Sequence, residues 1–503
     1  MGAARRDGAA RHDGGELPDA ARHRRGGRRV RAERGAAART RRPAHRERHA
    51  PAARRLIARH QGPRGRPGRF GRRVLRGLAP RRCPVREPVA TARDARQPGE
   101  ERPPAYRQFV LKVHGRCNLA CTYCYLYRGP DTTWRDRPAR VAPGTMRQAA
   151  ERIAEHAAAH RLPSARVDLH GGEPLLGGPG TALEYVKTVR AAVRRAAPGC
   201  ALRFFVQTNG TLLTAATLRR LAAAGVRVGI SADGGTAALN HRRVDHAGRP
   251  SWPAVDRAAR LLAEQVPEAY AGILCTVDVA QDPLETYTSL LALRPPALDL
   301  LLPHANWDAP PPALPAPGEP GRTARATPYG DWLVRVFDRW WDAGRLETRV
   351  RLFEEILALL LGAPSAVESL GHSPGAAVLV ETDGSIERVD SLRSAYHGAS
   401  ATGFDVFHDA FTTVREHFGA GTDPPRTCRR CPVFRVCGGG NPTHRYAPAT
   451  GFRNPSVYCA DLERLIRHVA DRLGRAAAPE EAGPPGPSRP DGNGVSGHPI
   501  PLW

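Results

Sequence analysis

Three cysteines lie close together in the sequence Cys117-Asn-Leu-Ala-Cys121-Thr-Tyr-Cys124. They follow a short apolar run, residues 109–113, which predicts a strand. Three thiolates gathered in one loop after a strand suit an iron–sulfur cluster with three protein ligands, because one iron then stays open for chemistry. A structural zinc site has four protein ligands, usually in two separated pairs, so this spacing favours the cluster over zinc.

A second group of cysteines lies near the C-terminus. Its members are Cys428, Cys431, Cys437 and, 22 residues after Cys437, Cys459. Four thiolates are enough for one fully ligated cluster or for zinc, and the local spacing does not separate these alternatives. The first motif favours iron and sulfur here too. Cys200 lies at the start of the predicted strand 201–208 and Cys275 lies within the predicted strand 271–277; neither has a nearby partner, and both are predicted core thiols. Cys83 is given no role.

Strand-like apolar segments alternate with amphipathic segments between residues 106 and 306. The predicted strands are residues 109–113, 166–170, 201–208, 227–232, 271–277 and 297–302, and the predicted helices between them are 146–160, 183–196, 214–224 and 255–264. This alternation predicts an α/β fold with a parallel sheet, whose strands present the functional site at their carboxyl ends.

Short polar motifs follow three of these strands, namely His170-Gly-Gly-Glu-Pro174, Gln207-Thr-Asn-Gly210 and Ser231-Ala-Asp-Gly234. Paired glycines let a backbone approach a ligand closely, and a glutamate beside them can pair with an ammonium group. Each motif alone is an ordinary strand-to-helix turn. Their shared position at strand ends points to one site, in which His170 is either a pocket residue or hydrogen-bonded scaffold.

The first cysteine motif, with Tyr123 before its third cysteine, resembles that of radical SAM enzymes, and the resemblance covers about residues 105–470. It implies a partial (β/α)6 TIM-like barrel, with S-adenosylmethionine on the open iron and a 5'-deoxyadenosyl radical as reactive species. The implied contacts are Gly171, Gly172 and Glu173 at the methionine amino group, Tyr123 at the adenine, Ser231 and Arg243 near the carboxylate and ribose, and Gln207 and Asn209 as further candidates. For Arg242 and Arg243 the alternative is a solvated loop charge.

The second cysteine group resembles the SPASM extension of radical SAM enzymes that modify peptides. A full extension holds two auxiliary clusters, but Asn441 and Val389 occupy two expected cysteine positions, and residues 368–374 offer no third. The resemblance therefore implies two [4Fe–4S] clusters in all, one binding S-adenosylmethionine and one auxiliary. With residues 380–384 and 437–446, the pattern most resembles the FxsB-type maturases, which join an aromatic ring carbon to the β-carbon two residues on.

This resemblance predicts an enzyme that forms such a carbon–carbon cross-link, a cyclophane, in a short ribosomal precursor peptide. Its expected partner is an electron donor such as flavodoxin or ferredoxin, and no protein residue is predicted to be catalytic. The alternatives are formylglycine-generating sulfatase maturation and thioether formation, against which Asn441 and Val389 count. A non-enzymatic zinc or RNA-binding protein is the alternative of another class, and Glu173 with the glycines before it counts against that.

Most of the basic charge lies in the first hundred residues, where 29 arginines and 9 acidic residues carry +20 of the net +27. This segment lacks apolar periodicity, so we predict disorder rather than a nucleic-acid site. The chain has only two lysines, Lys112 and Lys187, against 74 arginines, which indicates a coding bias. No apolar run approaches 18 residues, so neither a signal peptide nor a membrane span is predicted, and the clustered cysteines fit a reducing cytoplasm.

Five segments are predicted from these features. They are a disordered Arg-rich arm (1–104), a radical SAM core (105–308), a Pro-rich linker (309–328), a SPASM-like α+β auxiliary-cluster domain (329–475) and a disordered tail (476–503). Within the auxiliary domain, residues 329–343 and 352–361 are predicted helices. Aromatic residues of the first of these helices are expected in the core, and residues 377–389 are predicted to form a hairpin.

Overall fold

The computed structural model describes residues 105–314, 326–365, 367–371, 377–419 and 423–477. The predicted arm, Cys83, residues 315–325 of the predicted linker and almost all of the predicted tail lie outside this part of the chain. The predicted boundary between the core and the auxiliary domain stays a prediction.

Six strands form the parallel sheet that the sequence predicts. They are β1 (Gln108–His114), β2 (Ser164–Gly171), β3 (Ala201–Thr208), β4 (Val226–Ser231), β5 (Tyr270–Thr276) and β6 (Ala297–Leu301), and each pairs in parallel with the next. Most of their apolar side chains are buried, as expected for a sheet covered by helices. The α/β prediction is therefore confirmed, with strand bounds within two residues of those expected.

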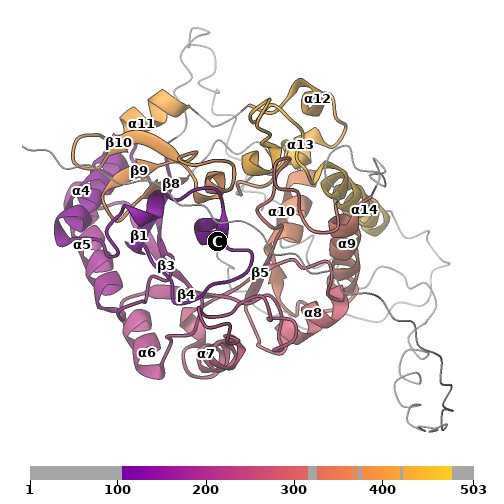
Figure 1. Cartoon of the computed structure of the whole chain (residues 1–503), viewed down its shortest axis with the longest axis horizontal. Coiled ribbons are helices and arrows are strands. Elements are labelled where there is room, and N and C mark those ends of the chain that lie inside the picture. The colour runs from indigo at the N-terminus through magenta and orange to yellow at the C-terminus, as the bar shows by residue number, and fades with distance from the viewer. Residues whose placement is uncertain (1–104, 315–325, 366, 372–376, 420–422, 478–503) are drawn as a thin grey trace, which may run out of the picture. The chain divides into compact units, whose positions relative to one another are not determined.

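Helices lie outside these strands (Figure 1), as in a partial TIM-like barrel. They are α4 (Pro143–Ala159), α5 (Gly180–Ala196), α6 (Ala215–Ala223), α7 (Trp252–Gln265) and α8 (Pro283–Leu291). Each packs an apolar stripe onto the sheet, for example Leu218 and Leu221 of α6. Because the helices close the outside, the carboxyl ends of the strands are where polar side chains can gather.

The sheet continues beyond both edges of this barrel. The strand β7 (Arg349–Val350) pairs with β6, and β8 (Ala377–Val380) pairs in parallel with β1. The strands β9 (Ser385–Glu387) and β10 (Ala401–Asp405) then follow, antiparallel, to give a ten-stranded sheet. The hairpin from β8 to β9 confirms the prediction, and Gly384 supplies the positive φ of +98° that its turn needs. Its pairing with β1 was not predicted.

The C-terminal helices carry the second cysteine group and much of the core. They are α9 (Pro328–Trp341), α10 (Arg351–Leu360), α11 (Phe411–Phe418), α12 (Arg426–Arg429), α13 (Phe434–Cys437) and α14 (Cys459–Ala477). In α9, Trp340 and Trp341 are each 1% exposed, and the Phe337 ring stacks on Trp341 with centroids 5.5 Å apart. Core packing, the role predicted for these aromatics, is confirmed.

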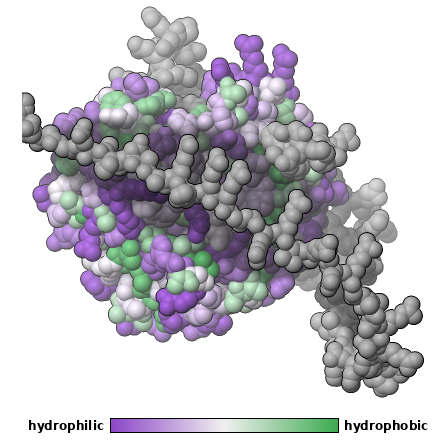
Figure 2. Space-filling model, viewed as in Figure 1, coloured by the Kyte–Doolittle hydropathy of each residue, from purple (hydrophilic) through white to green (hydrophobic). Residues whose placement is uncertain are grey.

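Where Figure 2 leaves the described residues in view, hydrophobic residues lie among hydrophilic ones. A search of the described helices for a stretch with the length and hydropathy of a membrane span finds none.

Candidate active site

The first cysteine motif forms the loop that follows β1, and it is held by a second loop after β4. The backbone N–H groups of Ala120 and Thr122 donate to the carbonyls of Val244 (2.7 Å) and Arg242 (3.0 Å). The short helix α3 (Tyr125–Arg128) starts directly after Cys124. In Figure 1 this indigo segment lies inside the ring of strands. Its contacts with residues that follow β2 and β3, Glu173 N–H to the Arg116 carbonyl and Asn209 to Asn118, place the loop at the carboxyl ends of the strands.

The three thiols of this loop lie near one another and near hydrogen-bond donors. The pKa of Cys117 is raised to about 11, mainly by burial and in part by Glu173 and the neighbouring thiols of Cys121 and Cys124. The backbone N–H of Leu119 lies 3.4 Å from the Cys117 sulfur, and the Asn209 amide nitrogen lies 3.7 Å from it. Donors placed at a ligand sulfur stabilise the negative charge of a bound cluster, so this loop fits an iron–sulfur cluster.

The glycines Gly171 and Gly172 allow two backbone segments to touch. A Cβ atom on Gly171 would lie 2.2 Å from the His114 carbonyl oxygen, and one on Gly172 would lie 2.6 Å from that of Arg116. The backbone N–H of Gly172 donates to the same His114 carbonyl at 2.9 Å. The pair thus packs the end of β2 against the residues that lead into Cys117, and this close approach is reason enough for glycine.

Glu173 is fully buried, and its carboxylate joins the ends of β2 and β3. It accepts hydrogen bonds from the Thr208 hydroxyl (2.7 Å), the Asn209 backbone N–H (2.8 Å) and the Leu175 backbone N–H (3.0 Å). Burial raises its pKa, while these bonds act in the opposite direction. Two predicted site residues, Glu173 and Asn209, are therefore brought together beside Cys117.

Tyr123 lies in a buried polar triad that includes a residue the sequence reasoning missed. Its hydroxyl donates to Asp233 and accepts from the Arg243 guanidinium at 2.7 Å. Asp233 also accepts from the Thr276 backbone N–H at 3.1 Å. Arg243 is 8% exposed, which excludes a solvated loop charge for this residue, whereas Arg242 forms its ion pair with Asp278 at 3.6 Å. Asp233 could have been identified from the sequence by its position in the motif Ser231-Ala-Asp-Gly234, which follows β4.

Gln207 and Ser231 form a further pair at the carboxyl ends of β3 and β4. The Gln207 amide nitrogen donates to the Ser231 hydroxyl at 2.9 Å. Asn209 donates to the Asn118 side-chain oxygen, also at 2.9 Å, which ties β3 to the cysteine loop. The structure thus gathers the predicted cofactor residues along one edge of the sheet, around the first cysteine group.

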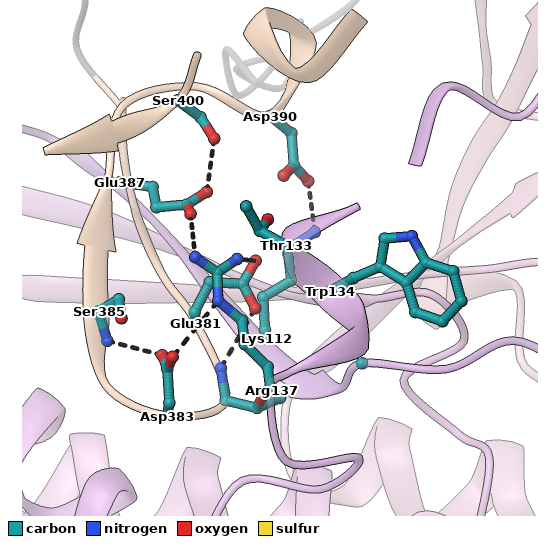
Figure 3. Close-up of polar contacts among 12 residues, drawn as sticks. Lys112, Thr133, Trp134, Arg137, Glu381, Asp383, Ser385, Glu387, Asp390 and Ser400 are labelled. Atoms are coloured by element: carbon teal, nitrogen blue, oxygen red, sulfur yellow. Dashed lines mark hydrogen bonds and ion pairs between the residues drawn. The ribbon is translucent and has the colours of Figure 1, made fainter. Parts of the chain in front are cut away.

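A buried polar network joins this edge to the C-terminal hairpin (Figure 3). Arg393, whose side chain is 2% exposed, pairs with Asp131 at 3.1 Å and with Glu381 at 2.6 Å. Burial acts to lower the pKa of Arg393, but the surrounding carboxylates raise it overall, so the group stays charged. Further ion pairs of the network are formed by Arg137 with Glu381, Asp383 and Glu387, by Lys112 with Asp390, and by Arg393 with Glu387 and Asp390.

Lys112 is the member of this network that lies on β1, and only 3% of its side chain is exposed. It pairs with Asp390 and contacts the Nδ1 atom of His170 at 3.3 Å. Burial acts to raise the pKa of Asp390, but Lys112 and Arg393 lower it to about 2. Burial and Lys112 lower the pKa of His170 to about 4. His170 is therefore neutral and bonded to Lys112, in line with the scaffold alternative.

The second cysteine group is gathered by α12, α13 and the start of α14. Burial raises the pKa of Cys437 to about 12, with the thiols of Cys459, Cys428 and Cys431 adding to it. All four predicted ligands are thus near one another. Cys200 and Cys275 are buried in the sheet core instead, at 8% and 0% exposure, as predicted.

The two positions that lack an expected cysteine have structural roles. The Asn441 side chain accepts from the Thr443 backbone N–H at 2.9 Å and so caps the short helix η4 (Pro442–Arg445). Val389 precedes the short helix η3 (Asp390–Ser394) and packs against a small apolar cluster that includes Leu392. Because neither side chain is a thiol, a second auxiliary cluster would lack two of its expected ligands.

The spacing of the sulfur atoms bears on which metal group fits. A tetrahedral zinc ion with Zn–S bonds of about 2.3 Å holds its sulfurs about 3.8 Å apart. In the described residues, three ligand atoms that all lie within 4.8 Å of one another occur at Glu381, Glu387 and Asp390, not at either cysteine group. The wider sulfur spacing suits a cluster. The carboxylates do not need a metal ion for charge balance, because Arg137 and Arg393 already form ion pairs with Glu381.

Comparison with known proteins agrees with this geometry. Residues 111–282 match the model of the Radical SAM superfamily. The serine-type anaerobic sulfatase-maturating enzyme of Klebsiella aerogenes is 29% identical over 353 residues, which are 69% of this chain and 82% of that enzyme. The cysteine-type enzyme of Clostridium perfringens (strain 13 / Type A) is 23% identical over 377 residues, which are 74% of this chain and 98% of that enzyme.

Solved structures show the same fold. Native anSMEcpe with bound AdoMet superposes with a TM-score of 0.58 at 20% identity, covering 73% of this chain and 98% of that one. Native anSMEcpe with bound AdoMet and the Kp18Cys peptide gives a TM-score of 0.58 at 21% identity, with the same coverage of both chains. The likeness extends well past the matched 172-residue segment into the C-terminal helices.

Proposed function

Because this chain is a radical SAM enzyme, which binds a [4Fe–4S] cluster and S-adenosylmethionine, we propose that it oxidises a short ribosomally made peptide. The first cluster, held by Cys117, Cys121 and Cys124, would supply with S-adenosylmethionine a 5'-deoxyadenosyl radical that removes a hydrogen atom from a β-carbon of the peptide. The residues along the strand ends would hold and orient the cofactor, as the protein does in cofactor enzymes generally.

We propose that the product is a cyclophane. The β-carbon radical bonds to a ring carbon of an aromatic residue two positions away, and the adduct then loses one proton and one electron. The peptide therefore loses two hydrogens in all, one as part of 5'-deoxyadenosine and one as a proton. Cys428, Cys431, Cys437 and Cys459 would hold an auxiliary cluster, which would supply an acceptor for this electron, and an external carrier of the flavodoxin or ferredoxin type would exchange electrons with the enzyme.

One observation supports the oxidative step that this proposal requires. The second cysteine group offers four thiols, which saturate a four-iron cluster, while Asn441 and Val389 are committed to a helix cap and to apolar packing. A saturated cluster has no open iron for the substrate, so it is suited to accept an electron. Electron acceptance is what an oxidative cross-link requires after the carbon–carbon bond has formed.

The second candidate is formylglycine formation on a peptide serine or cysteine. It is favoured by the similarity to the serine-type and cysteine-type sulfatase-maturating enzymes along 69% and 74% of this chain. This reaction uses the same β-carbon radical and also releases one proton and one electron. It differs from the cross-link in its product, which is an aldehyde.

Two synthetic peptides distinguish the candidates. One ends in Trp-Ala-Asn and lacks serine and cysteine, and the other carries a single serine and no aromatic residue. A cyclophane enzyme converts the first to a product two hydrogens lighter that does not react with a hydrazide and does not fragment between Trp and Asn. Conversion of the serine peptide alone, to a hydrazide-reactive product two hydrogens lighter, would instead identify a formylglycine-forming enzyme.

A further inference from the structure

The segment after β6, residues 303–307, lies between the two cysteine groups and is tied to the C-terminal elements at several points. The Tyr458 hydroxyl donates to the Pro303 carbonyl at 2.9 Å, and the Asn306 amide donates to the Ser394 carbonyl at 2.8 Å. The Trp307 backbone N–H donates to the Tyr446 carbonyl at 2.9 Å. Tyr458 directly precedes Cys459, so this segment is fixed relative to the second cysteine group.

His304 occupies this segment and faces aromatic groups from both sides of the site. Its ring meets that of Tyr125 edge to face, with centroids 4.5 Å apart, and Tyr125 directly follows Cys124. On the other side it lies 6.0 Å from the ring of His444, which in turn meets Tyr458 at 4.8 Å. His304 therefore stands between the loop of the first cysteine group and the residue before Cys459.

The imidazole of His304 has a free nitrogen at this position. Its Nδ1 atom is buried and has no hydrogen-bond partner in the described part of the chain. Burial lowers the pKa of His304 to about 4, and the carboxylate of Asp390 acts in the opposite direction. The pKa of His444 is lowered to about 3, mainly by burial and in part by His304. Both rings are therefore neutral at pH 7, and a neutral imidazole can accept a proton.

Other titratable side chains at the strand ends are already committed. Glu173 accepts three hydrogen bonds, and Asp390 is paired with Lys112 and Arg393. His170 is bonded to Lys112, and Asp233 is bonded to Tyr123. A group that takes a proton from a substrate needs a nitrogen or oxygen that is not held in a hydrogen bond, and His304 has one in its Nδ1 atom. In the described residues the Oδ1 atom of Asp390 and the Nε2 atom of His444 also lack a hydrogen bond, but Asp390 is held by its ion pair with Arg393. Of the two histidines, His304 is the one whose ring meets Tyr125, the residue next to Cys124.

We propose that His304 is the base that takes the proton released when the peptide adduct is oxidised. This inference rests on the proposed function. In the balanced step, the carbon–hydrogen bond at the attacked ring carbon breaks and its proton goes to the imidazole. The cluster that the second cysteine group would hold would be the acceptor for the electron. The same base would serve if the substrate is a serine peptide, because formylglycine formation also releases one proton and one electron.

The test separates radical formation from completion of the product. Wild type and His304→Asn are incubated with S-adenosylmethionine, an external reductant and the peptide that the wild type converts. We expect 5'-deoxyadenosine to form at the wild-type rate within about twofold, while the product two hydrogens lighter falls by about 10²-fold, as for loss of a positioned base. His417→Asn, at an exposed histidine of α11, is the matched control and should match wild type.

A second variant guards against a merely structural effect. In His304→Ala, added imidazole should restore the lighter product, since it can occupy the space that the side chain leaves. Normal product formation by His304→Asn would overturn the proposal. Equal loss of 5'-deoxyadenosine and product, without rescue by imidazole, would also overturn it, because His304 would then only position the site.

A titration without substrate separates this inference from the proposed function. Imidazole resonances of the wild type that are missing in His304→Asn report the pKa of His304 directly, and we expect a value well below 6. A value above 7 would overturn the proposal, since the ring would be protonated at neutral pH. If the wild type converts neither peptide, the proposed function fails, while this titration still decides whether His304 is a neutral acceptor.

Discussion

Replacing Lys112 with methionine tests how the barrel is joined to the C-terminal hairpin. Methionine keeps much of the buried aliphatic volume of lysine but removes the ammonium that pairs with Asp390 and contacts His170. In the wild type, Lys112 and Arg393 overcome the effect of burial and hold the pKa of Asp390 at about 2, against a usual value of 3.8. A fall of nearly two pKa units corresponds to about 2–3 kcal/mol of stabilisation.

The loss of folding free energy expected for Lys112→Met follows from this pKa shift of Asp390. Breaking a buried ion pair by removing one partner typically costs about 3–5 kcal/mol, but Arg393 remains beside Asp390 in the variant. We therefore expect a loss of about 2–3 kcal/mol at pH 7. With about 2–4 °C per kcal/mol for a large domain, the midpoint of thermal unfolding should fall by about 4–12 °C.

The pH dependence has a definite sign. The folded-state pKa of Asp390 is depressed, so its contribution is present above its unfolded pKa of about 3.9 and is lost as the pH falls toward about 2. The difference between wild type and variant should therefore be largest near pH 7 and shrink below pH 4. The pKa of His170 should rise from its wild-type value of about 4, because the nearby ammonium that helps to lower it is gone.

The chain offers a matched control for this experiment. Lys187, the only other lysine in the sequence, is exposed on α5, and Lys187→Met should unfold at the wild-type temperature. Apparent midpoints of the metal-free proteins are compared by circular dichroism at pH 7 and pH 3.5. If Lys112→Met and Lys187→Met unfold within 1 °C of each other at pH 7, the ion pair does not stabilise the fold and the reasoning is refuted.

Three further outcomes follow from the site. Replacing Cys117, Cys121 and Cys124 together with alanine should lower the iron content from about eight to about four per chain and abolish cleavage of S-adenosylmethionine; cleavage that persists would place the open cluster elsewhere. Cys459→Ala should spare 5'-deoxyadenosine formation but stop the product two hydrogens lighter, and a normal yield of that product would remove the electron-accepting role of the second cluster. Gly171→Ala, whose Cβ would lie 2.2 Å from the His114 carbonyl oxygen, should lower stability by about 1–3 kcal/mol and reduce cluster loading, whereas the exposed and uncrowded Gly199→Ala should do neither.

The barrel could be predicted because its signals are local. Each strand is a short apolar run, each helix has an apolar stripe, and the motifs at the strand ends come in chain order, so the placement of Glu173, Asn209 and Ser231 at one edge followed. Gly171 was correctly placed, but its close neighbour in the structure is the backbone of β1. A glycine pattern alone does not say whether backbone or ligand comes near.

The residues that sequence reasoning missed depend on contacts between distant parts of the chain. Lys112 and Asp390 are 278 positions apart and meet because β8 pairs with β1, which no local pattern indicates. His304 gains its position from the hydrogen bonds that tie the segment after β6 to residues beyond 440. A signal for Lys112 was present nevertheless, since a lysine kept on a buried strand is unusual in a chain with 74 arginines.

The peptide-oxidising activity proposed for this enzyme is tested most directly by the ratio of 5'-deoxyadenosine to peptide product in one anaerobic reaction. Wild-type enzyme with both clusters reconstituted is given S-adenosylmethionine, an external reductant and the peptide ending in Trp-Ala-Asn, and both products are quantified by mass spectrometry. We expect one 5'-deoxyadenosine for each peptide that becomes two hydrogens lighter. When the β-carbon of the peptide is deuterated, its deuterium should be recovered in the deoxyadenosine. Deoxyadenosine that forms without deuterium from the peptide, while the peptide mass stays unchanged, would contradict the proposed activity.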